Sequence, residues 1–355
     1  MTTDALTPSL ARADSSRAIA YWLLACAAMV FAMAVIGAIT RLTGSGLSMV
    51  EWRPLIGALP PLSEAEWQRV FDLYRETPEY QKVNAGMGLE AFKEIFFWEW
   101  FHRLWGRSIG LVFALPFAWF WLTGRIARPL LPRLIGFLVL GGLQGLLGWF
   151  MVRSGLVDRP SVSHYRLAAH LGLAVLIYGL LVWQAWALLS RAAPVAAPAL
   201  RRHGVVAVVL VAVTMLWGAF VAGLDAGMAY NSFPLMDGRL LPPEAWSLIP
   251  AWLNPFDNTA LVQFLHRWLA IGTAGVILAL WLRARAGPAP LRLATAIAAG
   301  IAVLQVLLGI ATLLAAVPVW LGAAHQAGAL ILLTALLWCV YVTRRKTANP
   351  PAQSG

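Results

Sequence analysis

Two short segments carry polar residues within an otherwise apolar chain. The first is WEWFHR, residues 98–103, and the second is VQFLHR, residues 262–267. Each ends in a His-Arg pair, but Glu99 of the first corresponds to Gln263 of the second. A carboxyl group can exchange a proton and an amide cannot, so only the first segment offers acid–base chemistry.

Four of the six histidines occupy matched positions in the two halves of the chain: His102 with His266, and His170 with His325. Ionisable groups in an apolar environment usually face the interior of a helix bundle. Two imidazoles from two helices suit the axial ligation of a haem iron. No Cys or Asp ligand lies near them, which disfavours zinc. A histidine that only hydrogen-bonds a neighbouring helix is the alternative, but the repeated pair favours haem.

Glu99 is the one acid of sixteen that lies clearly within a predicted membrane span. It precedes His102 by three residues, so both side chains share one face of a helix. A carboxyl beside a haem edge is a candidate for proton transfer or for stabilising a developing positive charge. The alternative is an ion pair with Arg103 or Lys93.

Two further sets of polar residues allow two interpretations each. Arg41, Arg103 and Arg267 either pair with haem propionates or extend to the membrane surface. Gln144 and Gln305 are a matched pair, which either joins two helices or supports a ligand histidine.

Four other residues of reactive types receive no role in the site. His164 and His203 have no counterpart in the other half of the chain. Cys26 and Cys339 both lie within predicted spans, and no outer loop contains a cysteine. A disulfide in an outer loop is therefore excluded.

The elements that must position these residues are membrane-spanning helices. The chain has 355 residues, of which 60% are hydrophobic and 12% charged, and its mean hydropathy is +0.71. A span needs about 20 mostly apolar residues, and long spans are helices. The sequence predicts eight of them: 18–39, 95–122, 134–152, 164–190, 204–222, 260–282, 293–315 and 322–343.

The net charge of +11 reports membrane topology. Four segments carry three basic residues and no acid: Arg125, Arg128 and Arg133; Arg191, Arg201 and Arg202; Arg283, Arg285 and Arg292; Arg344, Arg345 and Lys346. They fall on one side of the predicted bilayer, which is the positive-inside pattern. Both termini are therefore expected to be cytoplasmic, and no nucleic-acid partner is implied. Asp4 and Asp14 argue against a mitochondrial transit peptide, so we expect a bacterial inner membrane.

The chain also repeats itself internally. LQGLLG, residues 143–148, matches LQVLLG, residues 304–309, and the repeat is completed by the histidine pairs. Each half has four spans, so both halves share one orientation in the membrane. The predicted fold is all-α, with eight transmembrane helices as two tandem four-helix bundles. The expected parts are a cytoplasmic tail 1–17, the halves 18–190 and 204–343, a cytoplasmic linker 191–203 and a tail 344–355.

Three motifs resemble the heme A synthase family. They are GAITRLTGSGLSMVEWRPLIGALPP (37–61), KEIFFWEWFHRLWGR (93–107) and YNSFPLMDGRLLP (230–242), and the resemblance covers nearly the whole chain. The resemblance implies an enzyme that oxidises the C8 methyl group of haem o to a formyl group, which gives haem a. Some family members carry a cysteine pair in the outer loops, and this chain is similar to the subgroup without it.

The same resemblance implies a role for each site residue. His102 and His170 would ligate the substrate haem, and His266 and His325 the resident haem b, which would relay electrons. Glu99 would be the catalytic acid. A haem o synthase that hands over the substrate, an electron donor and the lipid bilayer are the implied partners, and both haem sites would lie near the outer face.

Two other functions fit part of the pattern. A non-enzymatic di-haem electron carrier of cytochrome b type accounts for four histidines, but gives no reason for one buried acid. A transporter with a His/Glu proton relay lacks the interrupted helices that many carriers have. The electron donor, the source of the formyl oxygen, the oligomeric state and the redox potentials are left open by the sequence.

Overall fold

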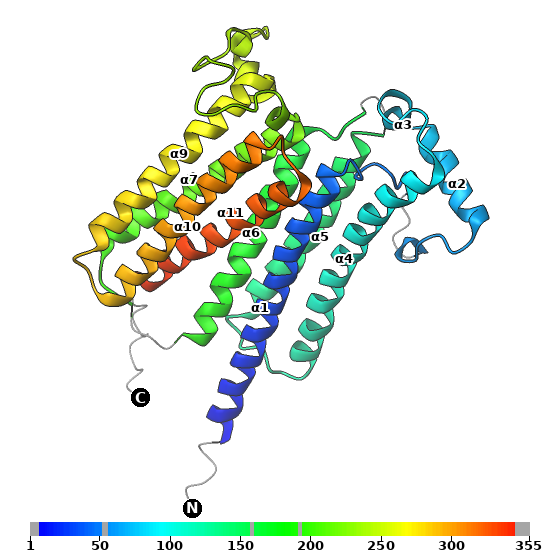
Figure 1. The fold of residues 1–355 in the computed structure, drawn as a ribbon. Coiled ribbons are helices and arrows are strands. Elements are labelled where there is room, and N and C mark those ends of the chain that lie inside the picture. Colours follow the sequence, from blue (N-terminus) through cyan, green and yellow to red (C-terminus); the bar gives the residue numbers. More distant parts are fainter. Residues whose placement is uncertain (1–6, 52–55, 157–159, 191–193, 345–355) are drawn as a thin grey trace, which may run out of the picture.

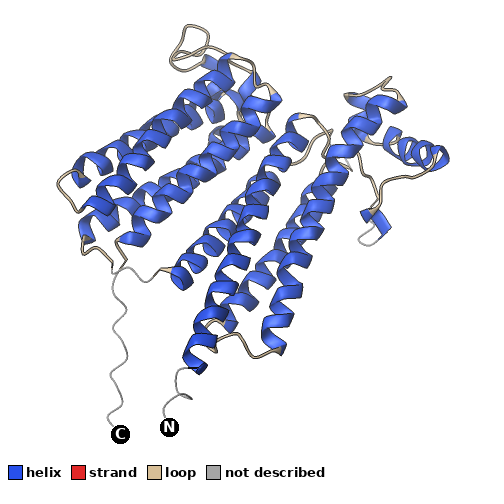
Figure 2. Ribbon diagram, turned by 60° about the horizontal axis from the view of Figure 1, so that its bottom comes forward, coloured by secondary structure: helices blue, strands red, loops and turns tan. Residues whose placement is uncertain are grey.

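The computed structural model describes residues 7–51, 56–156, 160–190 and 194–344. Within these ranges the chain is helical and forms no strand, and eight helices are long and apolar enough to cross a membrane (Figures 1 and 2). They are α1 (Thr7–Leu42), α4 (Leu89–Leu122), α5 (Leu131–Arg153), α6 (His164–Leu189), α7 (Pro198–Gly223), α9 (Thr259–Ala284), α10 (Ala289–Leu314) and α11 (Val319–Val342). The prediction of an all-α chain with eight spans is confirmed.

Several predicted boundaries differ from the helix ends. Helix α1 begins at Thr7, within the predicted tail 1–17, and α7 begins at Pro198, within the predicted linker 191–203. Polar residues can extend a helix beyond the apolar stretch that hydropathy detects, because the backbone remains hydrogen-bonded outside the bilayer. Residues 1–6, 191–193 and 345–355 of the predicted tails and linker lie outside the described residues.

The eight long helices pack in a connected pattern. Helix α1 contacts α4 and α6, and α5 contacts α6. Helix α7 contacts α9 and α11, and α10 lies between α9 and α11. The first four long helices meet the last four where α6 packs on α7 and α1 packs on α11.

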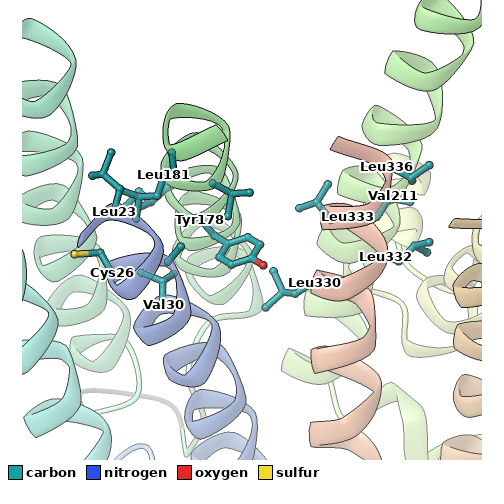
Figure 3. Close-up of a cluster of buried hydrophobic side chains, with 14 of the residues drawn as sticks. Leu23, Cys26, Val30, Tyr178, Leu181, Val211, Leu330, Leu332, Leu333 and Leu336 are labelled. Atoms are coloured by element: carbon teal, nitrogen blue, oxygen red, sulfur yellow. The ribbon is translucent and has the colours of Figure 1, made fainter. Parts of the chain in front are cut away.

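The main apolar core lies where α1, α6, α7 and α11 meet. Leu23 of α1, Leu181 of α6 and Leu336 of α11 are among its buried side chains (Figure 3). The Tyr178 hydroxyl points toward α11, where its oxygen lies 2.8 Å from the Thr334 hydroxyl oxygen. Close packing and interhelical hydrogen bonds are the interactions that hold helices together in lipid.

A small outer layer follows α1. It contains the 3-10 turn η1 (Ile56–Ala58), α2 (Glu64–Arg75) and α3 (Pro78–Lys82). The Ser63 and Thr77 hydroxyls accept backbone N–H bonds and so cap α2 and α3. Helix α2 is amphipathic and buries Phe71 and Tyr74 toward α4.

A second outer layer precedes α9. It contains three 3-10 turns and one short helix: η2 (Ala226–Met228), η3 (Pro243–Trp246), η4 (Ala251–Leu253) and α8 (Asn254–Asp257). Both outer layers lie on the same side of the molecule, opposite the end at which α11 finishes (Figure 1). The four matched histidines lie in helices that begin or end under these layers.

Candidate functional site

Two of the matched histidines lie against glycines of the preceding long helix. A Cβ atom at Gly37 of α1 would lie 3.4 Å from His102 Nε2 of α4. One at Gly218 of α7 would lie 3.2 Å from His266 Cε1 of α9. The absent side chain therefore leaves space for each imidazole between its own helix and the neighbouring one.

The other two histidines repeat this arrangement on the following helices. A Cβ atom at Gly148 of α5 would lie 3.1 Å from His170 Cε1 of α6. One at Gly309 of α10 would lie 2.8 Å from His325 Cε1 of α11. All four predicted ligands thus sit in a glycine cradle that a larger residue would fill.

The geometry of the second pair fits two ligands on one iron. The ring centroids of His266 and His325 are 6.5 Å apart, and the ring planes are nearly perpendicular, at 85°. A metal–imidazole bond is about 2 Å long, so both rings would reach one iron at this separation. His266 Nδ1 is buried with no hydrogen-bond partner in the described structure.

The two matched glutamines hold two of these histidines. Gln144 Nε2 donates to the His170 carbonyl oxygen at 3.0 Å and lies 3.3 Å from both ring nitrogens. Gln305 Nε2 donates to the His325 carbonyl oxygen at 2.7 Å and lies 3.1 Å from its Nδ1. Each amide therefore joins two helices and contacts a candidate ligand, so both sequence interpretations describe real contacts.

Glu99 is buried, with 2% of its surface exposed. Its Oε2 accepts hydrogen bonds from the Ser48 hydroxyl at 2.7 Å and the Met49 backbone N–H at 2.6 Å. Its Oε1 accepts from Arg103 Nη2 at 2.5 Å. The ion pair with Arg103 is therefore formed, whereas Lys93 pairs with other acids. Three donors converge on the carboxylate, and two come from the segment that follows α1.

Gln263 occupies the place in α9 that Glu99 occupies in α4, but one of its hydrogen-bond partners is an acceptor. Its Oε1 accepts from Arg267 Nη2 at 3.1 Å, and its Nε2 donates to the Tyr230 carbonyl oxygen at 3.1 Å. The outer segment offers donors to Glu99 in the first half and a carbonyl to Gln263 in the second. A carboxylate suits the first environment and an amide the second.

Comparison of the amino-acid sequence with known proteins identifies the family of this chain. Residues 20–337 match the family model of the COX15-CtaA cytochrome oxidase assembly proteins. Heme A synthase of Rhodospirillum centenum is 56% identical over 352 residues, which is 97% of this chain and 94% of that protein. The chain belongs to the heme A synthase family. Heme A synthases of Nitrosospira multiformis (50% identical, 92% of this chain and 94% of that protein) and Paramagnetospirillum magneticum (50%, 96% and 99%) are also similar. The predicted resemblance is confirmed.

The conspicuous arginines of this heme A synthase family member bind its own outer segments. Arg103 Nη2 also donates to the Met49 carbonyl oxygen at 2.9 Å. Arg267 donates to the carbonyl oxygens of Tyr230 and Ser232, each at 2.7 Å. Arg41 pairs with Asp225 at 2.8 Å, across the two halves of the chain. A contact of these arginines with haem propionates stays a prediction.

One contact in this family member was missed by sequence reasoning. His164 is buried at the start of α6, and its Nε2 lies 3.0 Å from Asp257 Oδ1 of α8. The neighbouring Tyr165 hydroxyl donates to the other oxygen of Asp257 at 2.7 Å. The partners are more than ninety residues apart, so no local pattern indicates the pair. His203 Nε2 lies 3.0 Å from the Val276 carbonyl oxygen of α9.

Proposed function

We propose that the protein converts haem o into haem a, by oxidising the C8 methyl group to a formyl group in successive hydroxylations. The observation that carries the proposal is the combination of two matched histidine pairs with one buried acid, Glu99, in only one half. Membership of the heme A synthase family supports the same reaction. The product would serve a cytochrome oxidase.

The architecture that we propose is a tandem pair of four-helix bundles in the same orientation, within 18–190 and 204–343. The contact of α6 with α7 corresponds to that of α1 with α11, as expected for a two-fold relation. A matched turn supports the repeat, because Gly44 and Asp225 both follow a long helix by two residues. Both have left-handed backbones, with φ of 64° and 51°.

We assign the substrate to the first half, because its helices leave more room. Helices α9 and α10 pack closely, whereas their counterparts α4 and α5 make few contacts. Ala302 of α10 is buried, with 1% exposed, while Gly141 at the matching place of α5 is exposed. A bundle that must admit and release a haem needs such space, and a bundle with a resident haem does not.

We assign the resident haem b to His266 and His325, which the ring distance supports. Bound there, the haem would supply electron transfer to and from the first half. His102 and His170 would hold the iron of the substrate haem. The two glutamines, Gln144 and Gln305, would fix the helix pairs that carry one ligand of each site.

Glu99 is the residue that we assign to proton chemistry. It lies on the same helix as His102, about one turn away. A cavity of about 380 Å³ reaches Ser48, Met49 and Arg103, the three residues that donate to Glu99. The cavity lies in the outer layer, so it brings the outer aqueous phase to the residues that hold the Glu99 carboxylate.

The location that we propose is the bacterial inner membrane, with cytoplasmic termini and haem sites near the outer face. The basic loops between α4 and α5 and between α9 and α10 support this orientation. A haem o synthase would hand over the substrate, which is poorly soluble, and a separate donor would supply electrons.

The test is to express the chain with a haem o synthase in cells that lack haem a, and to extract and chromatograph the haems. We expect haem a with the native chain and haem o without it. A purified protein that contains only haem b, from cells that accumulate haem o and make no haem a, would favour the di-haem electron carrier instead.

A further inference from the structure

A second buried carboxyl group lies outside the haem sites. Glu79 of α3 is 8% exposed, and its Oε2 accepts a hydrogen bond from the Tyr74 hydroxyl at 3.1 Å. Asn84 Nδ2 donates in turn to the Tyr74 hydroxyl oxygen at 2.7 Å. In the described part of the chain, no Lys, Arg or His forms an ion pair with Glu79.

Aromatic rings enclose this group and connect it to α4. Tyr74 stacks on Phe92 with ring centroids 5.1 Å apart, and Phe92 lies 5.7 Å from Phe96. Phe96 is one helical turn before Glu99 on the same helix. The outer layer therefore places Glu79 near the turn of α4 that carries Phe92, about two helical turns before Glu99.

Groups on α1, α2 and α4 influence the ionisation of Glu79. Burial is the main cause that raises the pKa of Glu79 from 4.5 to about 7. The hydrogen bond from Tyr74 of α2 lowers this pKa, the charge of Glu99 of α4 raises it, and the charge of Arg41 of α1 lowers it. Burial also raises the pKa of Tyr74. At neutral pH the Glu79 carboxyl is therefore divided between its protonated and ionised forms.

The second half contains another Tyr–Glu pair, but its carboxyl group is exposed to solvent. The Tyr230 hydroxyl donates to Glu244 Oε1, and Glu244 is exposed. The hydrogen bond from Tyr230 is the main cause that lowers the pKa of Glu244. This pair lies in the outer segment that contacts Gln263, through the Tyr230 carbonyl. A buried acid thus accompanies Glu99, and an exposed, ionised acid accompanies Gln263.

We propose that Glu79 is a second acid of the substrate half, which exchanges one proton with the outer aqueous phase and so changes the charge of the outer layer that covers Glu99 during turnover. The proposal rests on the proposed function for its link to catalysis. Glu79 does not touch the substrate site, so it acts through Glu99. Its ionised form adds a negative charge near the Glu99 carboxylate, and its neutral form removes that charge. The two acids are thereby coupled.

The test measures the pH dependence of haem a formation by the purified holoenzyme. The native enzyme should show an ionisation near neutral pH that is absent from Glu79→Gln, because the amide does not titrate. Glu79→Gln keeps an acceptor for Tyr74 and should retain haem b. The matched control, Glu244→Gln, changes the exposed pair of the other half and should keep the native profile. An unchanged profile in Glu79→Gln overturns the proposal.

Tyr74→Phe gives a second, graded result. It removes the hydrogen bond that stabilises ionised Glu79, so the pKa of Glu79 rises and the ionisation in the profile moves by about one unit to higher pH. If Tyr74 only supported the fold, Tyr74→Phe would lower activity at every pH without moving the profile. This result would contradict the proposal.

An infrared measurement separates this proposal from the proposed function. The carbonyl stretch of a protonated carboxyl should disappear from the native protein between about pH 6 and about pH 8. The band should be absent from Glu79→Gln and present in Glu244→Gln. This readout needs no turnover, so it tests Glu79 even if the native chain makes no haem a. A band that is missing from the native protein, or that persists in Glu79→Gln, overturns the assignment.

Discussion

Arg103 Nη2 donates to Glu99 Oε1 at 2.5 Å, one helical turn along α4, and the same nitrogen donates to the carbonyl oxygen of Met49. The backbone N–H of Met49 in turn donates to Glu99 Oε2. Glu99, Arg103 and the backbone of Met49 therefore form one closed hydrogen-bonded unit. Glu99 fastens the segment after α1 to α4, in addition to the chemistry proposed for it, and each substitution must be interpreted with both roles in view.

Glu99→Gln should abolish haem a formation, with haem o accumulating and haem b retained. The substitution preserves volume, which by itself predicts a small loss of packing. The structure adds a penalty of about 1–3 kcal/mol, because the new NH₂ group must face a donor. Extraction and chromatography of haems from cells provide the measurement. Ser48→Ala is the control, since it removes one donor from Glu99 and keeps the acid. Equal losses in the two variants would mean that Glu99 only anchors the loop.

Gln263→Glu should destabilise the second half without creating a second active site. The new carboxylate would meet the carbonyl oxygen of Tyr230 in place of an N–H donor, at a cost of about 1–3 kcal/mol. A lower thermal midpoint for haem b loss in the purified protein is the expected result. Gln81→Glu adds the same charge at an exposed position of α3 and should change nothing. A Gln263→Glu protein as stable as this control would contradict the hydrogen-bond assignment.

His325→Ala should remove haem b, because the iron would retain one protein ligand. His266→Ala should do the same, whereas His164→Ala should leave the haem in place, since His164 contacts Asp257 instead. Absorption spectra of the purified variants give the haem content and spin state. An unchanged low-spin spectrum in His325→Ala would be incompatible with the ligand assignment.

Gly309→Ala should weaken haem b binding although glycine has no functional group. The added Cβ would lie 2.8 Å from His325 Cε1, so the imidazole must move. Gly300→Ala, on the same helix, meets no atom within 4 Å and is the matched control. Titration of the apoprotein with haem b compares their affinities. Equal affinities would show that the cradle is not needed for ligation.

Topology is open to direct measurement. Reporter fusions should place 40–93 and 223–258 outside the inner membrane and 283–292 inside, because basic loops stay in the cytoplasm. An external 283–292 loop would reverse the proposed orientation and would place both haem sites near the cytoplasmic face.

The sequence by itself determined the eight spans, because a lipid environment demands long apolar helices and leaves a signal in each of them. It also determined the histidine candidates, since an internal repeat displays the same pair twice. His102 with His266 needed no tertiary contact to be noticed. The family followed from motifs that are contiguous in the chain.

Only the tertiary structure decided what each of these side chains touches. The partners of Glu99 in the outer segment lie about fifty residues away, and Asp257 lies more than ninety residues from His164. The burial of Glu79 was equally hidden, since its local sequence is polar and typical of an exposed helix. Hydrogen bonding and burial depend on which segments meet in space. A repeat or a hydropathy pattern describes each segment separately, so it does not specify the tertiary contacts between segments.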